Sequence, residues 1–203
     1  MIGLLRKDLY MTFAYFRVFL LMVALFLAVG VFGHDVGMFV IVYPMIIGMM
    51  LPVSLLSYDE RFHWSRSCDA MPCSRAQVVS AKYLLTLLSV LLIFALTMLG
   101  QGIKLAGSGR LAELADLAPL LLGLGLVGPA LLLPIMFWLG VEKGRIAYYV
   151  AVGVVVALGV GVGMNSGGAP VFSAPVWVPT AAASLLFAVS WLLSIRLYEK
   201  REL

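Results

Sequence analysis

Six apolar segments whose middles hold no charged side chain constrain the fold of this chain more than any other feature. A helix needs about 20 mostly apolar residues to cross roughly 30 Å of hydrocarbon. Backbone polar groups in lipid must be satisfied within the segment, and no alternating barrel pattern is present, so each run predicts a helix. The segments lie near 18–33, 37–57, 78–100, 117–140, 147–164 and 180–198. We therefore predict an all-α membrane protein with six transmembrane helices, forming a single transmembrane domain over residues 1–203.

The composition supports this class. The chain is 63% hydrophobic and 12% charged, with a mean hydropathy of +1.08, whereas soluble domains are about half apolar and about a quarter charged. Arg6 and Lys7 precede the first apolar run, as in a signal peptide, but 17 residues of amphipathic sequence come before that run and no good cleavage site follows it. We expect a retained first helix.

The basic residues predict the orientation, because cytoplasmic loops of membrane proteins are enriched in Lys and Arg. With a cytoplasmic N-terminus, only Lys104 and Arg110 fall outside. The basic residues inside are then Arg6, Lys7, Arg17, Arg61, Arg66, Arg75, Lys82, Lys143, Arg145, Arg196, Lys200 and Arg201. Both termini are therefore predicted to be cytoplasmic. The net charge of +4 fits basic residues beside an anionic leaflet, so it requires no nucleic-acid partner.

The apolar segments lack the groups that ion-coupled transporters use, since their middles contain no Asp, Glu, Lys, Arg or His. Arg17 and Lys82 lie at predicted cytoplasmic ends of segments, where we expect their side chains to extend to water. The chain also has no His-Glu-x-x-His, Gly-x-Ser-x-Gly or phosphate-loop motif. We predict that it is not an enzyme and has no ATPase site, so energy for uphill transport would come from another chain.

His63, Cys68 and Cys73 could suggest a metal site. Their spacings of five and five lack the close Cys-x-x-Cys pair of zinc sites and supply no fourth ligand. The predicted topology also places both cysteines in a reducing compartment, where disulfides are rare. We expect neither a metal nor a disulfide here.

The N-terminal segment, residues 1–17, has the periodicity of an amphipathic helix. Its apolar residues recur at steps of three and four, while Arg6, Lys7, Asp8 and Thr12 occupy much of the remaining surface. The apolar set is Ile2, Leu5, Leu9, Phe13 and Phe16. Such a helix can lie in the membrane interface, either as a simple anchor or as a contact element for a cytosolic partner.

The connection at 58–73 combines charges of both signs with aromatic residues, a composition enriched at protein interfaces. We predict a short helix ending near Pro72. Ser74 and Gln77 then form a capping box for the next helix. The alternative for 58–73 is a polar loop with an interfacial Trp64.

The run from Tyr58 to Tyr83 carries several short motifs. They are Asp-Glu at 59–60, Trp64, Met-Pro at 71–72, Arg75, Val-Val at 78–79 and Lys-Tyr at 82–83. This run resembles the signature of small ABC-2 type ABC transporter permeases, and is similar in particular to the bacterial branch that exports peptides, including phenol-soluble modulin exporter permeases.

The resemblance implies a half-transporter in a bacterial cytoplasmic membrane. Two six-span permease subunits, identical or different, would form one pathway for a hydrophobic or amphipathic substrate such as a peptide. Two separate ATPase subunits would bind Mg-ATP and dock on the cytoplasmic side, so this chain would hold no cofactor. An ATP-independent carrier or channel is the alternative function.

The resemblance also suggests site residues. The family's connecting helix would correspond to about Ile2–Phe16, and its coupling helix to about Asp59–Met71. The predicted contacts with the ATPase are Lys7, Asp8, Asp59, Glu60, Arg61, Phe62, Trp64, Arg66 and Arg75. The apolar outer loop 165–179 would contain a gate with Phe172 and Trp177, unless these two are interfacial belt residues.

Overall fold

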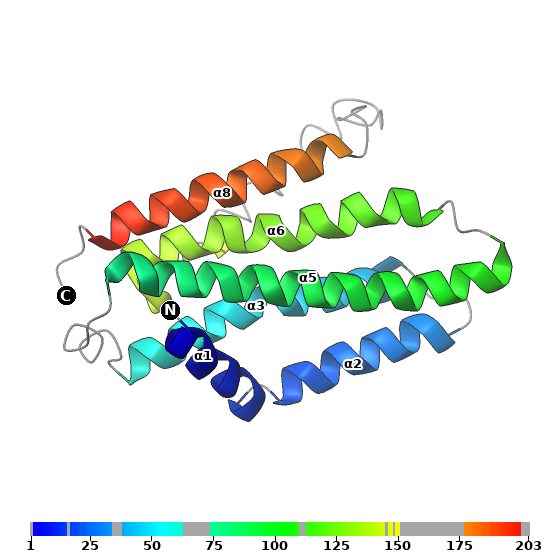
Figure 1. Cartoon of the computed structure of the whole chain (residues 1–203), viewed down its shortest axis with the longest axis horizontal. Coiled ribbons are helices and arrows are strands. Elements are labelled where there is room, and N and C mark those ends of the chain that lie inside the picture. Colours follow the sequence, from blue (N-terminus) through cyan, green and yellow to red (C-terminus); the bar gives the residue numbers. More distant parts are fainter. Residues whose placement is uncertain are drawn as a thin grey trace.

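The computed structural model describes residues 2–15, 17–33, 38–62, 74–109, 113–144, 146–147, 149–150 and 177–199. Within these residues the secondary structure is helical, as predicted. The helices are α1 (Ile2–Tyr15), α2 (Arg17–Phe32), α3 (Met38–Arg61), α5 (Arg75–Ser108), α6 (Glu113–Leu139) and α8 (Trp177–Glu199). Figure 1 shows α2, α3, α5, α6 and α8 running alongside one another, with the shorter α1 near the end where α5 begins.

Four of the described helices, α3, α5, α6 and α8, are long and apolar enough to cross a membrane. The α1–α2 pair, bent by 70° between Arg6–Thr12 and Arg17–Phe32, makes a fifth candidate if it is counted as one span. The predicted segment at 147–164 lies almost entirely outside the described residues. The number of six spans therefore stays a prediction.

Two helices extend beyond the predicted segments. Helix α3 continues through Arg61 instead of ending at residue 57, so Tyr58–Arg61 form its last turn and not the start of a separate helix. Helix α5 has 34 residues, or about 51 Å at 1.5 Å per residue, which exceeds the hydrocarbon core. Its first turn is fixed by the predicted capping box of Ser74 and Gln77, and it ends at Gly109 with φ 72°. The capping box is confirmed.

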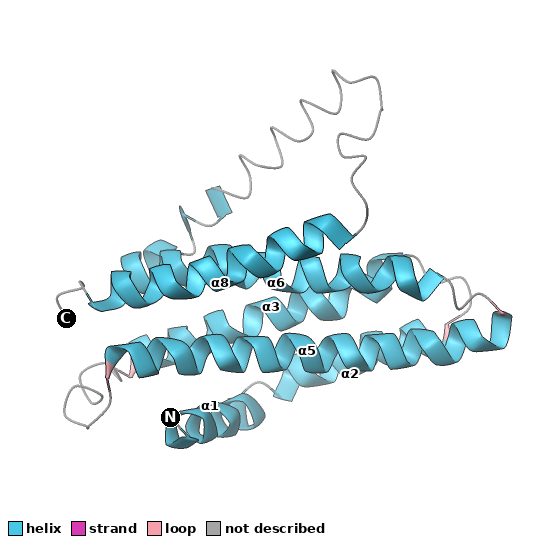
Figure 2. Cartoon of the chain, turned by 45° about the horizontal axis from the view of Figure 1, so that its top comes forward, coloured by secondary structure: helices cyan, strands magenta, loops and turns pink. Residues whose placement is uncertain are grey.

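The helices alternate in direction except for one pair. The Thr180 hydroxyl near the start of α8 donates to the Pro119 carbonyl near the start of α6. The rings of Phe137 and Tyr198 meet near the ends of the same two helices, with centroids 5.4 Å apart. Helices α6 and α8 are therefore parallel neighbours, as the two views in Figures 1 and 2 also show.

Close packing joins α3 to α6 through two glycines. A Cβ atom at Gly128 would collide with Met49 Sδ, and one at Gly125 would lie 2.6 Å from Met45 Cε. Without Cβ atoms at these positions, the two helices approach closely enough for the methionines to pack against the α6 backbone.

The starts of α2 and α5 and the ends of α3, α6 and α8 gather at one end of the bundle, which we call the basic end. Eight of the described basic residues lie there: Arg6, Lys7, Arg17, Arg61, Arg75, Lys82, Lys143 and Arg196. Lys104 lies at the opposite end, where its Nζ donates to the Gly33 and Gly30 carbonyls at 2.8 and 3.3 Å. The Gln101 amide also donates to the Gly30 carbonyl, at 3.4 Å. Together these bonds satisfy carbonyls at the end of α2 that have no partner within the helix.

Candidate functional site at the basic end

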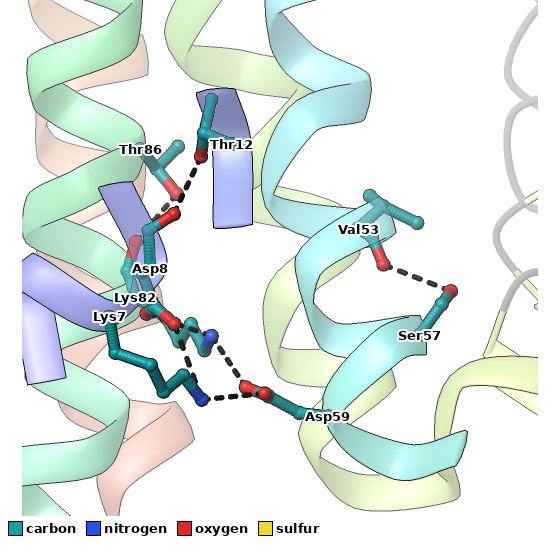
Figure 3. Close-up of polar contacts among 8 residues, drawn as sticks. All are labelled: Lys7, Asp8, Thr12, Val53, Ser57, Asp59, Lys82 and Thr86. Atoms are coloured by element: carbon teal, nitrogen blue, oxygen red, sulfur yellow. Dashed lines mark hydrogen bonds and ion pairs between the residues drawn. The ribbon is translucent and has the colours of Figure 1, made fainter. Parts of the chain in front are cut away.

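Four charged side chains meet inside the basic end, and we call Lys7, Asp8, Asp59 and Lys82 the ion cluster. Lys82 Nζ lies 2.8 Å from Asp8 Oδ2 and 2.6 Å from Asp59 Oδ2. Lys7 Nζ lies 2.7 Å from Asp59 Oδ1 and 3.5 Å from Asp8 Oδ1. Figure 3 shows the two ammonium groups lying between the two carboxylates. The cluster joins α1, α3 and α5.

Local backbone contacts help to hold the cluster. The Thr12 hydroxyl donates to the Asp8 carbonyl, and the Thr86 hydroxyl donates to the Lys82 carbonyl (Figure 3). Each contact links residues four apart on one helix and satisfies the threonine hydroxyl locally, so the Asp8 and Lys82 side chains remain available to pair with each other across the helices.

The burial of the cluster makes its charge balance important. Lys82 is 3% exposed and Asp8 is 2% exposed. Taking such charges out of water costs several kcal/mol per ion, and this cost is offset only when opposite charges are close. With two cations and two anions the ion cluster is neutral, so loss of any single member would leave a buried charge uncompensated.

A second link at this end joins α3 to the chain after α6. The Val141 backbone amide donates to Glu60 Oε2 at 2.7 Å. Gly140, with φ 82°, ends α6 and allows the chain to turn into the helical residues 141–144. An open pocket of about 690 Å³ lies beside this link, lined by Ser57, Glu60, Arg61, Leu139, Gly140, Val141, Glu142 and Lys143.

A third link joins α5 to α8 through Tyr83, the residue that follows Lys82. Its hydroxyl lies 2.7 Å from both Ser190 Oγ and Ser194 Oγ. Its ring stacks on Trp191, with centroids 5.6 Å apart and planes 9° apart. Tyr83 is fully buried. Consecutive residues therefore attach α5 to different neighbours, Lys82 to α1 and α3 and Tyr83 to α8.

A family model described as ABC-2 family transporter protein matches residues 3–199. The match covers nearly the whole chain and all of the helices that build the basic end. The chain belongs to the ABC-2 transporter family. It is therefore a multi-pass membrane protein and a permease component of an ABC transporter, whose ATPase is a separate subunit. No curated protein and no solved structure gives a significant match.

Most of the predicted ATPase contacts gather at the basic end of this ABC-2 permease. Glu60, Arg61 and Phe62 are exposed, Phe62 by 65%. Lys7, Asp59 and Arg75 are partly buried, the first two within the ion cluster. Trp64 and Arg66 lie outside the described residues. Contact with an ATPase stays a prediction for all of them.

Two expectations about buried side chains require correction. Lys82 was expected to extend to water, but its ammonium group contacts two carboxylates inside the bundle. Asp8 and Thr12 were placed on the polar surface of an amphipathic helix, but both are buried. The physical reason is the same: α1 turns its Asp8–Thr12 side toward α3 and α5, where Lys82 supplies the opposite charge. Leu9, from the predicted apolar set, is exposed.

The predicted gate residues, and the His and Cys residues at which no metal was expected, lie away from the ion cluster or outside the described residues. Trp177 begins α8 at the end opposite the basic end and is 66% exposed. Phe172 lies outside the described residues, as do His63, Cys68 and Cys73. In the part of the chain that the structure describes, no group of three His, Cys, Asp or Glu side chains is placed to hold a metal ion.

Sequence reasoning missed both the ion cluster and the Tyr83 link. A signal existed in the Lys-Tyr pair at 82–83, which places a cation and a phenol in the third turn of a largely apolar helix. The acidic partners could not be assigned, because they come from two other helices.

Proposed function

We propose that this permease is the membrane subunit of a bacterial exporter, which moves a hydrophobic or amphipathic substrate, most simply a peptide, out of the cell. Two ATPase subunits bind Mg-ATP and dock on the basic end, and a second permease subunit, identical or different, completes the pathway. The uncharged middles of the apolar helices support this substrate class, because they offer no counter-charge to a small ion. The resemblance to peptide exporters supports the direction.

The distribution of basic residues supports a cytoplasmic basic end. Eight described Lys and Arg residues lie there, against Lys104 at the other end, and such residues favour the cytoplasmic side. The parallel course of α6 and α8 supports six crossings, because a chain that leaves α6 at the basic end must return across the membrane before α8 begins.

The orientation predicts how cysteines respond to a membrane-impermeant thiol reagent. In intact cells Cys68 and Cys73 should stay unlabelled, and both should react once the cells are permeabilised. As a control, Asp116→Cys in a Cys68→Ser, Cys73→Ser background places a thiol on an exposed position near the opposite end. That thiol should react in intact cells. The reverse labelling pattern would place the basic end outside and overturn the docking proposal.

The observation that most supports the proposed function is an exposed surface at the end of α3, which ion pairs and a hydrogen bond hold in place. Arg61 and Phe62 are exposed at the end of α3, directly after Asp59 and Glu60. Asp59 is held by two lysines, and Glu60 accepts a bond from Val141. The Phe62 ring also lies over Tyr58, with centroids 6.2 Å apart. Arg and aromatic side chains held in place in this way are typical of interface hot spots.

Arg61→Ala and Phe62→Ala should each weaken ATPase binding by about 30-fold, which corresponds to the loss of about 2 kcal/mol expected for a hot-spot side chain. Both positions are exposed, so expression and thermal stability should be unchanged. The measurement is recovery of the ATPase with the tagged permease from native membranes, followed by titration of the purified subunits. Asp116→Asn, an exposed change at the opposite end, is the matched control and should bind as the parent does.

Two outcomes would contradict the proposal. One is unchanged ATPase binding and ATP hydrolysis in both alanine variants. The other is gradient-driven transport by the permease alone in liposomes without an ATPase, which would indicate the alternative of a carrier or channel.

A further inference from the structure

Lys82 is the point at which three helices are joined by charge. Its ammonium group lies within 2.8 Å of a carboxylate from α1 and a carboxylate from α3, and the side chain itself belongs to α5. Neither contact has hydrogen-bond alignment, and Asp8 Oδ1 has no hydrogen-bond partner among the described residues. The attraction is therefore mainly one of charge, which tolerates small changes of angle while keeping the helices together.

Lys7 makes a different connection. It lies 2.7 Å from Asp59 and so joins α1 to α3, and 3.5 Å from Asp8, its neighbour on the same helix. It is also more exposed than Lys82, with side-chain exposures of 22% and 4%. The two lysines thus divide the ion cluster into an α1–α3 link and a link that includes α5.

The residue after Lys82 extends the connection. Successive side chains on a helix point about 100° apart, so Tyr83 faces α8 while Lys82 faces α1 and α3. Tyr83 is held there by Ser190 and Ser194. A displacement of α1 that moves Lys82 therefore moves α5 at the same turn that contacts α8.

We propose that Lys82 is a positioning residue for energy coupling. It holds α1 and α3 against α5, so that a displacement of α1 or α3 produced by the ATPase reaches α5 and then α8. This inference rests on the proposed function and deepens it, because it assigns a role to a side chain that touches neither ATP nor the surface.

Two variants that keep the buried charges balanced separate this role from simple stabilisation. Lys82→Met with Asp8→Asn removes one cation and one anion and leaves the Lys7–Asp59 pair, so α1 stays linked to α3 but not to α5. Lys82→Arg is the matched control, because it keeps a cation between Asp8 and Asp59 and leaves every predicted ATPase contact in place. Both variants avoid an uncompensated buried charge, and both should melt near the parent temperature.

The experiment uses the full permease assembled with its ATPase in proteoliposomes, with Mg-ATP as the probe. The readout is the stimulation of ATP hydrolysis on assembly, relative to the free ATPase. Lys82→Met with Asp8→Asn should assemble normally, because Asp8 is buried and does not reach the docking surface, but the stimulation should fall about fivefold, a typical size for coupling between sites. Lys82→Arg should retain the stimulation. Equal stimulation in the two variants would overturn the proposal.

A distance measurement provides a second readout that does not depend on the ATPase. Spin labels at Tyr10→Cys on α1 and Leu88→Cys on α5, both exposed positions, are placed in a Cys68→Ser, Cys73→Ser background in lipid nanodiscs. The distance distribution should broaden in the Lys82→Met, Asp8→Asn variant and stay narrow in Lys82→Arg. A narrow, unchanged distribution in both would show that Lys82 does not position α1. If the parent permease assembles with no ATPase, the proposed function itself fails, and the coupling role fails with it.

Discussion

Lys82→Met should lower the free energy of unfolding by about 3–5 kcal/mol, the cost of removing one partner from a buried ion pair. The substitution leaves the Asp8 and Asp59 carboxylates opposite the single ammonium group of Lys7. Methionine fills nearly the same space, so the loss comes from charge and not from a cavity. Unfolding by heat or denaturing detergent, followed by far-ultraviolet circular dichroism, measures the change.

Lys143→Met provides the matched control, because Lys143 lies at the same end but is exposed. Surface substitutions of this kind usually change stability by no more than about 0.5 kcal/mol. Adding Asp8→Asn to Lys82→Met should restore most of the lost stability by restoring neutrality. A Lys82→Met variant as stable as Lys143→Met would mean that Lys82 is not buried among charges in the folded protein.

Tyr83→Ala should be similarly damaging, with an expected loss of about 3–5 kcal/mol, as found for large aromatic side chains removed from cores. The change removes the stacked contact with Trp191 and the edge contact with Phe187, whose ring centroid lies 5.3 Å away. It also leaves a cavity between α5 and α8. The same unfolding measurement applies.

Tyr83→Phe separates the ring from the hydroxyl. It keeps both ring contacts and removes only the contacts with Ser190 and Ser194, so the expected loss is about 1–2 kcal/mol. A Phe variant as unstable as the Ala variant would show that the hydroxyl, and not the ring, holds α5 against α8. An Ala variant close to the parent would contradict the α5–α8 contact altogether.

Local features of the fold could be predicted from the sequence. An apolar run in lipid must satisfy its own backbone hydrogen bonds, so its length and composition are enough to predict a helix. The capping box could also be predicted, because Ser74 and Gln77 lie within one turn and their bonds depend on local sequence alone. The end of α3 was less predictable. Its last turn is charged, and charge alone does not distinguish a helix that continues into water from one that stops.

The ion cluster could not be predicted, because pairing between helices depends on how they rotate and tilt against one another. Lys82 and Asp8 each lie at a position where a charged side chain can reach water. The rule that such side chains extend to water therefore favoured exposure. The rule fails here because α1 packs against α3 and α5. This packing pairs Asp8 with Lys82 inside the bundle and buries both side chains. That Arg61 and Phe62 contact the ATPase stays a prediction, drawn from the composition of residues 58–73 and from the family resemblance; the structure shows that both are exposed.

Helix α5 contains no proline, whereas α3 contains Pro44 and Pro52 and α6 contains Pro119, Pro129 and Pro134. It is fastened to α1 and α3 by Lys82 near one end and to α2 by Lys104 near the other, 22 residues or about 33 Å further along the helix. A helix without proline that is held at two such distant points moves as one rigid body. A small tilt imposed on it at one face of the bilayer would shift the far end of α2 at the opposite face, without any bending in between.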